Sequence, residues 1–302
     1  MENKYRVPKQ MVEGFLTDGT KKAQNSIRNI MLLGFMAGMF IAVGACCSSA
    51  AVFGIENAGL AKVVAGVIFP IGLMLIVLIG GELFTGDCLM FMGVLAGKYR
   101  IRSMFRVLAL VFVSNMMGAV LVAGLVFLSG QYDLGGAALG AYTIKVAVGK
   151  ASLSFSKAIT SGILCNVIVC LAVLMAYCAT DVVGKLFAVF FPIMAFVIGG
   201  FEHCVANMYY IPAGVFAASN DTYRQQAMGL YGLTASQIDS INLQNFFLTN
   251  LVPVTLGNMI GGMLLIGVPL FLLHVKKSDK AESNHPFNKI ASVDRVEKKK
   301  AE

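Results

Sequence analysis

The stretch FPIMAFVIGGFEHCVAN, residues Phe191–Asn207, begins as an apolar membrane helix and then departs from that pattern. Gly199 and Gly200 interrupt the apolar run, and Glu202 and His203 follow after Phe201. Ionisable residues are costly at membrane depth, so they usually face a cavity or a partner rather than lipid. Non-helical backbone is tolerated there only against protein or water. A broken helix that carries a histidine is therefore our first candidate for a permeation site.

The composition indicates a polytopic membrane protein. Of the 302 residues, 57% are hydrophobic and only 13% are charged, against about 25% charged residues in an average soluble domain. The net charge of +8 comes from basic residues in the tails and one short loop. This distribution follows the positive-inside rule and gives no indication of nucleic-acid binding. The seven cysteines lie mostly within apolar runs, so we interpret them as packing residues.

The sequence predicts an all-α integral membrane protein with six transmembrane spans. We expect a cytoplasmic N-terminal arm over residues 1–27, a six-helix pore domain over residues 28–275 and a cytoplasmic tail over residues 276–302. The N-terminal arm lacks the apolar stretch of a signal peptide. Runs long enough to cross a bilayer cover about residues 29–53, 60–79, 107–128, 158–179, 186–211 and 245–274.

An even number of spans places both termini on one side of the membrane. The N-terminal arm, the loop 97–106 and the C-terminal tail are rich in Lys and Arg. We therefore expect all three in the cytoplasm and the protein in the cell membrane. Under this topology Lys145, Lys150 and Lys157 lie outside, against the rule.

The two halves of the chain resemble each other. With three spans in each half, the repeats run in opposite directions across the membrane. Glycine-interrupted segments at corresponding positions of two such halves point to a central transport site, so we expect the second and fifth spans to be interrupted. The corresponding segments are VIFPIG (67–72) with VFFPIM (189–194), LIGGELFTGD (78–87) with VIGGFEHCVAN (197–207), and SNMMG (114–118) with GNMIG (257–261).

Four motifs, in order along the chain, resemble the formate/nitrite transporter family. The resemblance covers about residues 25–275, and it implies an aquaporin-like protomer assembled as a homopentamer, with a pore for small monovalent anions in each protomer. The aquaporins themselves are excluded because the chain contains no Asn-Pro-Ala. The motifs are GELFTGD (81–87), GILCNVIVC (162–170), GFEHCVANMYYIPAG (200–214) and NLVPVTLGNMIGG (250–262).

The resemblance also implies which residues form the pore. His203 corresponds to the central pore histidine and Glu202 to the neighbouring acid. The excursion over residues 212–244 is longer than in short members of the family. The other corresponding residues are Leu83, Phe84 and Thr85 on the loop that interrupts the second span, Phe69 and Phe196 at constrictions, Asn166 and Asn258 on the pore side, and Lys150 at the outer mouth.

Each of these residues has a chemical role and a structural alternative. A histidine can change its charge near physiological pH, so His203 could stabilise an anion or protonate a weak acid; the alternative is a core histidine fixed by Glu202. Thr85 offers a hydroxyl to a carboxylate or is a turn residue. Leu83, Phe69 and Phe196 form apolar constrictions that exclude hydrated ions, or they are ordinary packing residues. Lys150 attracts anions or is a surface lysine. Asn258 lies on the pore side or, like Asn115, is a packing contact of the repeat.

The favoured function is a channel or proton-linked carrier for formate, with nitrite and hydrosulfide as alternatives. The expected partners are the anion, the bilayer and further copies of the chain, with no cofactor. A membrane enzyme or metal site at residues 202–204 is disfavoured, because metal sites need several convergent ligands and the chain has three histidines. A transport-silent membrane sensor is the third possibility.

Overall fold

The computed structural model describes residues 5–275, which form helices and the turns between them. The first half contains α1 (Pro8–Gln24), α2 (Ile27–Val52), α3 (Ala58–Ile68), α4 (Ile71–Ile79), α5 (Phe84–Asp87), η1 (Cys88–Met90), α6 (Phe91–Leu95) and α7 (Ile101–Leu128). The second contains η2 (Gln131–Asp133), α8 (Ala138–Ala151), α9 (Phe155–Cys178), α10 (Val182–Gly199), α11 (Cys204–Ala218), α12 (Asp221–Tyr231), α13 (Ala235–Asp239), and a last helix made of η3 (Asn245–Leu251), α14 (Val252–Met259), η4 (Ile260–Gly267), α15 (Val268–Leu270) and η5 (Phe271–Val275).

The described chain has six helices long and apolar enough to cross a membrane. They are α2, α3 continued by α4, α7, α9, α10 and the last helix. Two shorter apolar helices, Phe84–Leu95 and α11, follow the second and the fifth of these spans. The prediction that the described chain is all-α with six spans, of which two are interrupted, is therefore confirmed.

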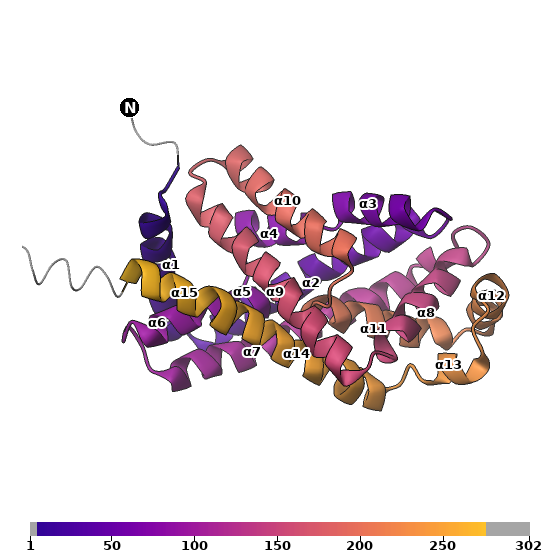
Figure 1. Cartoon of the computed structure of the whole chain (residues 1–302). Coiled ribbons are helices and arrows are strands. Elements are labelled where there is room, and N and C mark those ends of the chain that lie inside the picture. The colour runs from indigo at the N-terminus through magenta and orange to yellow at the C-terminus, as the bar shows by residue number, and fades with distance from the viewer. Residues whose placement is uncertain (1–4, 276–302) are drawn as a thin grey trace, which may run out of the picture.

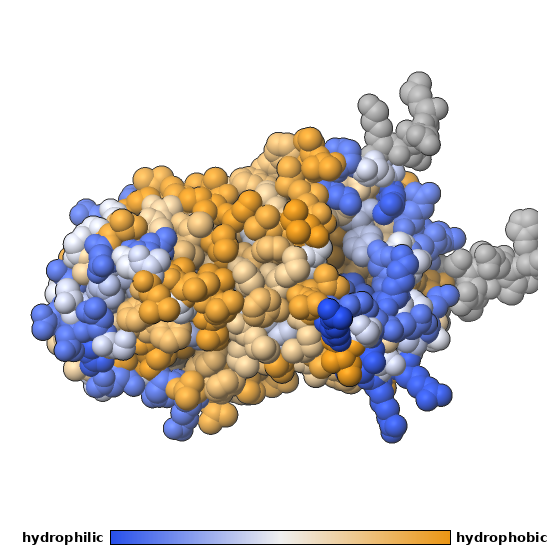
Figure 2. All heavy atoms as spheres, turned by 180° about the vertical axis from the view of Figure 1, so that it is seen from behind, coloured by the Kyte–Doolittle hydropathy of each residue, from blue (hydrophilic) through white to orange (hydrophobic). Residues whose placement is uncertain are grey.

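The outside of the bundle matches a membrane environment. Figure 1 shows α1 and α6 at one end and α8, α12 and α13 at the other, with both ends of the described chain at the α1 end. An apolar band separates two hydrophilic ends on the face shown in Figure 2. Large apolar side chains remain exposed on the spans, among them Leu121, Leu164, Phe187, Phe191 and Leu264. Apolar surface on this scale needs lipid or another subunit to cover it.

The long segments outside the spans are more ordered than the sequence indicated. The segments 129–157 and 212–244 contain α8 and α12, and these two helices pack against each other. A hydrogen bond of 2.6 Å from the Tyr223 hydroxyl to Asp133 ties α12 to the turn before α8. The span α7 begins at Ile101 rather than near residue 107, so Arg106 lies within it and donates to the carbonyl oxygens of Ala23 and Asn25.

The interruption of the second span is shorter than expected. It ends at Leu83, because the N–H of Phe84 is bound by a side chain of α7 and starts the helix α5 there. Phe84 and Thr85 are therefore helical rather than part of a loop. Asp87 is the last residue of α5, and its carboxylate pairs with Lys22.

Glycines let the spans of each half approach closely. A Cβ atom added at Gly118 of α7 would collide with the carbonyl oxygen of Phe35 in α2. In the second half, a Cβ at Gly261 of the last helix would collide with the carbonyl oxygen of Ile163 in α9. Small residues at such contacts are the usual means of close packing between membrane helices, where lipid supplies no hydrophobic drive.

We predict that Gly118→Ala destabilises the protein by about 1–3 kcal/mol, because the added methyl group overpacks the contact between α2 and α7. Gly124→Ala, in the same helix, is the matched control: its Cβ would find only ring atoms of Phe216, at 3.9 and 4.0 Å. It should be neutral or stabilising by about 0.5–1 kcal/mol, since alanine is the better helix former. Thermal unfolding of the purified protein in detergent measures both, and equal effects would contradict this account.

Candidate functional site

The two interrupted spans break in the same way. The chain leaves α4 at Gly80, with φ +102°, and leaves α10 at Gly200, with φ +68°. Positive φ values are accessible to glycine at little cost. A short extended segment follows each glycine, and the chain re-enters a helix at Phe84 in the first half and at Cys204 in the second.

A buried asparagine satisfies the broken backbone in the first half. The side-chain oxygen of Asn115 accepts from the N–H of Phe84 at 3.0 Å. Its amide nitrogen donates to the carbonyl oxygens of Gly34, at 2.7 Å, and Glu82, at 2.9 Å. Polar backbone groups at membrane depth must be satisfied by protein, so Asn115 is what allows the chain to bend there.

Asn258 does the same in the second half. Its side-chain oxygen accepts from the N–H of Cys204 at 3.0 Å, and its amide nitrogen donates to the carbonyl oxygens of Gly162, at 2.8 Å, and Glu202, at 3.0 Å. We call each of these arrangements an asparagine clasp. The clasps show that the internal repeat extends to individual hydrogen bonds, and they equate Glu82 with Glu202.

The two short helices meet at a buried hydrogen bond. The Thr85 hydroxyl lies 3.0 Å from Nε2 of His203. The other ring nitrogen, Nδ1, accepts from the N–H of Ala206 at 3.1 Å and so caps α11. Because Nδ1 is an acceptor, the proton of the neutral imidazole belongs on Nε2, directed at Thr85. Asn166 supports Thr85 from α9 by donating to its carbonyl oxygen at 3.1 Å.

A cavity approaches this contact from each end of the bundle. The cavity on the α1 side has a volume of about 730 Å³ and reaches Leu83. The cavity on the α8 side has a volume of about 160 Å³ and is lined by Phe69, Phe196, His203 and Lys150, among others. The rings of Phe69 and Phe196 meet edge to face, with 5.5 Å between centroids. The two cavities therefore approach the Thr85–His203 contact from opposite ends of the bundle, and two packed aromatic rings line the one on the α8 side.

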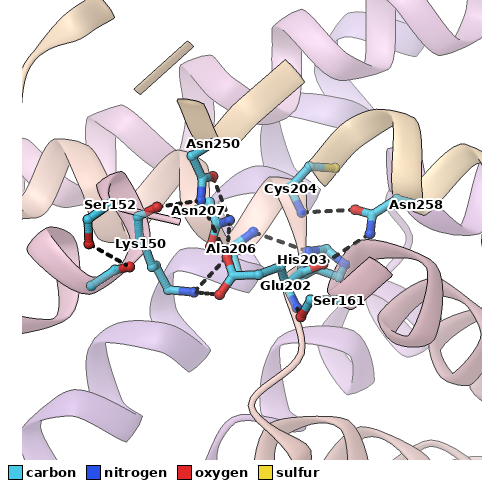
Figure 3. Close-up of polar contacts among 11 residues, drawn as sticks. Lys150, Ser152, Ser161, Glu202, His203, Cys204, Ala206, Asn207, Asn250 and Asn258 are labelled. Atoms are coloured by element: carbon cyan, nitrogen blue, oxygen red, sulfur yellow. Dashed lines mark hydrogen bonds and ion pairs between the residues drawn. The ribbon is translucent and has the colours of Figure 1, made fainter. Parts of the chain in front are cut away.

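We define the α8 mouth as the residues Lys150, Glu202 and Asn207 (Figure 3). The Lys150 ammonium donates to both Glu202 carboxylate oxygens, at 3.0 and 3.2 Å. Asn207 donates to Glu202 at 2.6 Å and to the side-chain oxygen of Asn250 at 2.7 Å. The expectation that Glu202 orients His203 is wrong, because the partners of its carboxylate are Lys150 and these amides rather than the imidazole.

We define the α1 mouth as Lys22, Glu82 and Asp87. The Lys22 ammonium, on α1, lies 2.5 Å from Glu82 and 2.6 Å from Asp87. Burial favours the neutral amine, but the two adjacent carboxylates outweigh it and raise the pKa of Lys22 well above its ordinary value. Sequence reasoning overlooked this cluster, although the repeat contained the signal: Glu82 stands two positions after Gly80, as Glu202 stands two positions after Gly200.

The structure separates the predicted site residues into three groups. His203, Lys150, Phe69 and Phe196 line the α8-side cavity, and Leu83 lines the α1-side cavity. Thr85 and Glu202 bond to residues of the α8-side lining. These two residues and the remaining three lie outside both linings: Phe84 packs edge to face on Phe112, and the amides of Asn166 and Asn258 are bound to backbone groups.

The other two histidines of the chain lie apart from residues 202–204 in the sequence. His274 lies at the end of the last helix, and His285 lies outside the described residues. Between residues 5 and 275 the structure contains no group of three or more His, Cys, Asp or Glu side chains placed to hold a metal ion.

We predict that Lys150→Met destabilises the protein by about 3–5 kcal/mol, because it leaves the buried Glu202 carboxylate without its cation. Lys145→Met is the matched control on the same helix: that ammonium lies 4.4 Å from the centroid of the Tyr231 ring, a contact worth about 0.5–1 kcal/mol. Adding Glu202→Gln to Lys150→Met should recover most of the loss. Thermal unfolding measures all three, and equal losses for the two single variants would refute the assignment.

Comparison with known proteins identifies the family to which the chain is similar. A family model described as "Formate/nitrite transporter" matches residues 9–272. The formate channel FocA of Haemophilus influenzae is 36% identical over 246 residues, which cover 78% of this chain and 84% of that protein. A protein of Methanothermobacter thermautotrophicus described as "Probable formate transporter" is 34% identical over 301 residues, covering 92% of this chain and 100% of that protein.

A solved structure described as "Pentameric formate channel with formate bound" superposes with a TM-score of 0.71 at 30% identity, covering 82% of this chain and 98% of that one. The two proteins therefore share the fold described above. The protein is a multi-pass membrane protein of a transport family and not an enzyme. This chain belongs to the formate/nitrite transporter family.

Proposed function

We propose that this protein is a channel for small monovalent anions of weak acids, with formate as its main substrate. The observation that carries the proposal is the buried contact between Thr85 and His203, which lies between a cavity lined by Leu83 and Gly86 on the α1 side and a cavity lined by His203 on the α8 side. A dry passage with a few fixed hydrogen-bond donors suits an anion that is small enough to shed its water in stages. The relatives described as formate channels support formate over other anions.

The pathway runs from the α1-side cavity past Leu83 to Thr85 and His203, and then between Phe69 and Phe196. The apolar side chains exclude hydrated ions. The Thr85 hydroxyl and the N–H on Nε2 of His203 are the donors offered to a carboxylate inside. Lys150, paired with Glu202, lines the cavity at the far exit.

His203 acts in this proposal as a neutral hydrogen-bond donor. A second proton on the ring would have to sit on Nδ1, which already accepts the N–H of Ala206. That N–H belongs to the first turn of α11, where the helix dipole disfavours a positive charge. Proton-linked transport through this pathway therefore calls for a group elsewhere that can hold the proton.

We place the α1 end in the cytoplasm and the protein in the cell membrane as a homopentamer. Basic residues gather at this end, as the positive-inside rule requires: Arg6, Lys9, Lys98, Arg100 and Lys185. The apolar sides of the spans offer surface for both lipid and neighbouring subunits. The pathway lies within one chain, so each subunit of the pentamer has its own pore.

Anion flux into liposomes that hold the purified protein tests the substrate. Formate, nitrite and hydrosulfide are compared in the wild type, Thr85→Val and Thr85→Ser. Formate should pass fastest. Thr85→Val should slow it by a factor of roughly 10 to 100, since a hydrogen bond to a charged group is worth about 1.5–3 kcal/mol, and Thr85→Ser should retain most of the flux. Passage of nitrite or hydrosulfide without formate would overturn the substrate, and no flux at all would favour the sensor.

A second pair of variants isolates Nε2 of His203. His203→Asn keeps a good capping oxygen for α11 but removes the donor at Thr85, whereas His203→Ala removes both. We predict that the two variants lose formate flux to a similar degree, roughly tenfold or more, while His203→Ala alone loses about 1 kcal/mol of stability. Flux in His203→Asn equal to that of the wild type would mean that the histidine serves only as a helix cap.

A further inference from the structure

The α1 mouth and the α8 mouth carry the same constellation with one difference. The asparagine clasps equate Glu82 with Glu202. A lysine from a flanking helix, α1 or α8, pairs with each glutamate. Five residues after each glutamate the two halves differ: Asp87 stands in the first half where Asn207 stands in the second.

Asn207 has a definite task in the α8 mouth. Its amide nitrogen donates to Glu202 at 2.6 Å, next to the Lys150 ammonium. An ionised Asp87 cannot do the same for Glu82, because a carboxylate has no hydrogen to donate. A protonated Asp87 can, because its O–H is a donor, and only that form reproduces the hydrogen bonding of the other half.

The charges of the two mouths lead to the same conclusion. The α8 mouth contains one lysine, one glutamate and one uncharged amide, and is neutral. The α1 mouth contains one lysine and two acids, and carries a net charge of −1 when both acids are ionised. The Asp87 side chain is 1% exposed, and its Oδ2 atom has no hydrogen-bond partner among the described residues. A buried excess charge is costly and is commonly removed by taking up a proton.

The other groups around Asp87 do not remove this excess. Tyr177 and Cys170 approach from α9, and Tyr99 from the turn before α7. On the α7 side, the uncharged Asn115 binds the start of the same helix. His203 of α11 bonds to Thr85, two residues away. The acid Asp18 and the bases Arg6, Lys21 and Lys185 line the same cavity, but the cation paired with Asp87 in the described chain is Lys22.

We propose that Asp87 is a proton-binding site that sets the charge of the α1 mouth. This inference rests on the proposed function and deepens it. With one proton taken up from water on the α1 side, Asp87 is a carboxylic acid that donates to Glu82, and the mouth is neutral like its counterpart. When that proton returns to water, the mouth carries one negative charge and repels anions. Anion entry from the α1 side therefore falls as the pH on that side rises.

The transport test uses proteoliposomes captured by an N-terminal affinity tag, so that the α1 end faces outward. Formate uptake is measured while the outer pH is raised from about 5 to about 8, a range in which exposed Asp and Glu are already largely ionised. Wild-type uptake should fall several-fold more steeply, up to about tenfold, than uptake by Asp87→Asn. The matched variant is Asn207→Asp, which should acquire the same dependence on the inner pH. Identical slopes in the wild type and Asp87→Asn would overturn the proposal.

Infrared spectroscopy determines the protonation state of Asp87 independently of any transport measurement. The infrared spectrum of the wild type near neutral pH should contain the carbonyl band of a protonated carboxylic acid. The band should be missing in Asp87→Asn and retained in Thr85→Val. Its absence from the wild type would show that Asp87 is ionised and would refute the site. If formate is not the substrate, formate uptake will be absent at every pH, but the infrared spectrum will still report the protonation of Asp87. A failure of the proposed substrate can therefore be distinguished from a failure of the proposed proton-binding site.

Discussion

The structure depends on satisfying the polar backbone where two membrane helices are broken. Asn115 and Asn258 each hold one N–H and two carbonyl oxygens, with distances between 2.7 and 3.0 Å. Lipid offers no substitute partner for these groups. Because the breaks are held open in this way, Thr85 lies in the first turn of α5 and His203 caps α11, and the two side chains meet instead of lying within continuous spans.

The electrostatic features follow from the same breaks. Each broken segment carries a glutamate below the membrane surface, and each glutamate is neutralised by a lysine from a helix that does not span: Lys22 on α1 and Lys150 on α8. The non-spanning helices thus contribute side chains to the two cavities, Lys22 to one and Lys150 to the other. The correspondence between the two halves also reveals where they differ. Asp87 stands in the first half at the position that Asn207 occupies in the second.

Much of this was predictable from the sequence, for identifiable reasons. Hydropathy located the six spans, and the paired Gly-Gly motifs located the breaks. His203 and Thr85 were found by the motifs, yet their mutual hydrogen bond was not, because it joins residues 118 positions apart. Lys22 was not predicted at the site, because the sequence indicated only a cytoplasmic N-terminal arm there. In the structure, α1 brings Lys22 into contact with Glu82 and Asp87. The end of the first break at Leu83 depends on Asn115, a contact that local sequence does not reveal.

The two asparagine clasps are completed at different stages of synthesis. Gly34, Glu82 and Asn115 all belong to the first three spans, so the first break can be closed as soon as α7 enters the membrane. The second break opens at Gly200 but is closed by Asn258 on the last helix, after the whole excursion through α12 and α13 has been synthesised. During that interval the nascent chain holds unpaired polar backbone at the depth of α11. The order of synthesis therefore makes the second half the vulnerable one during membrane insertion.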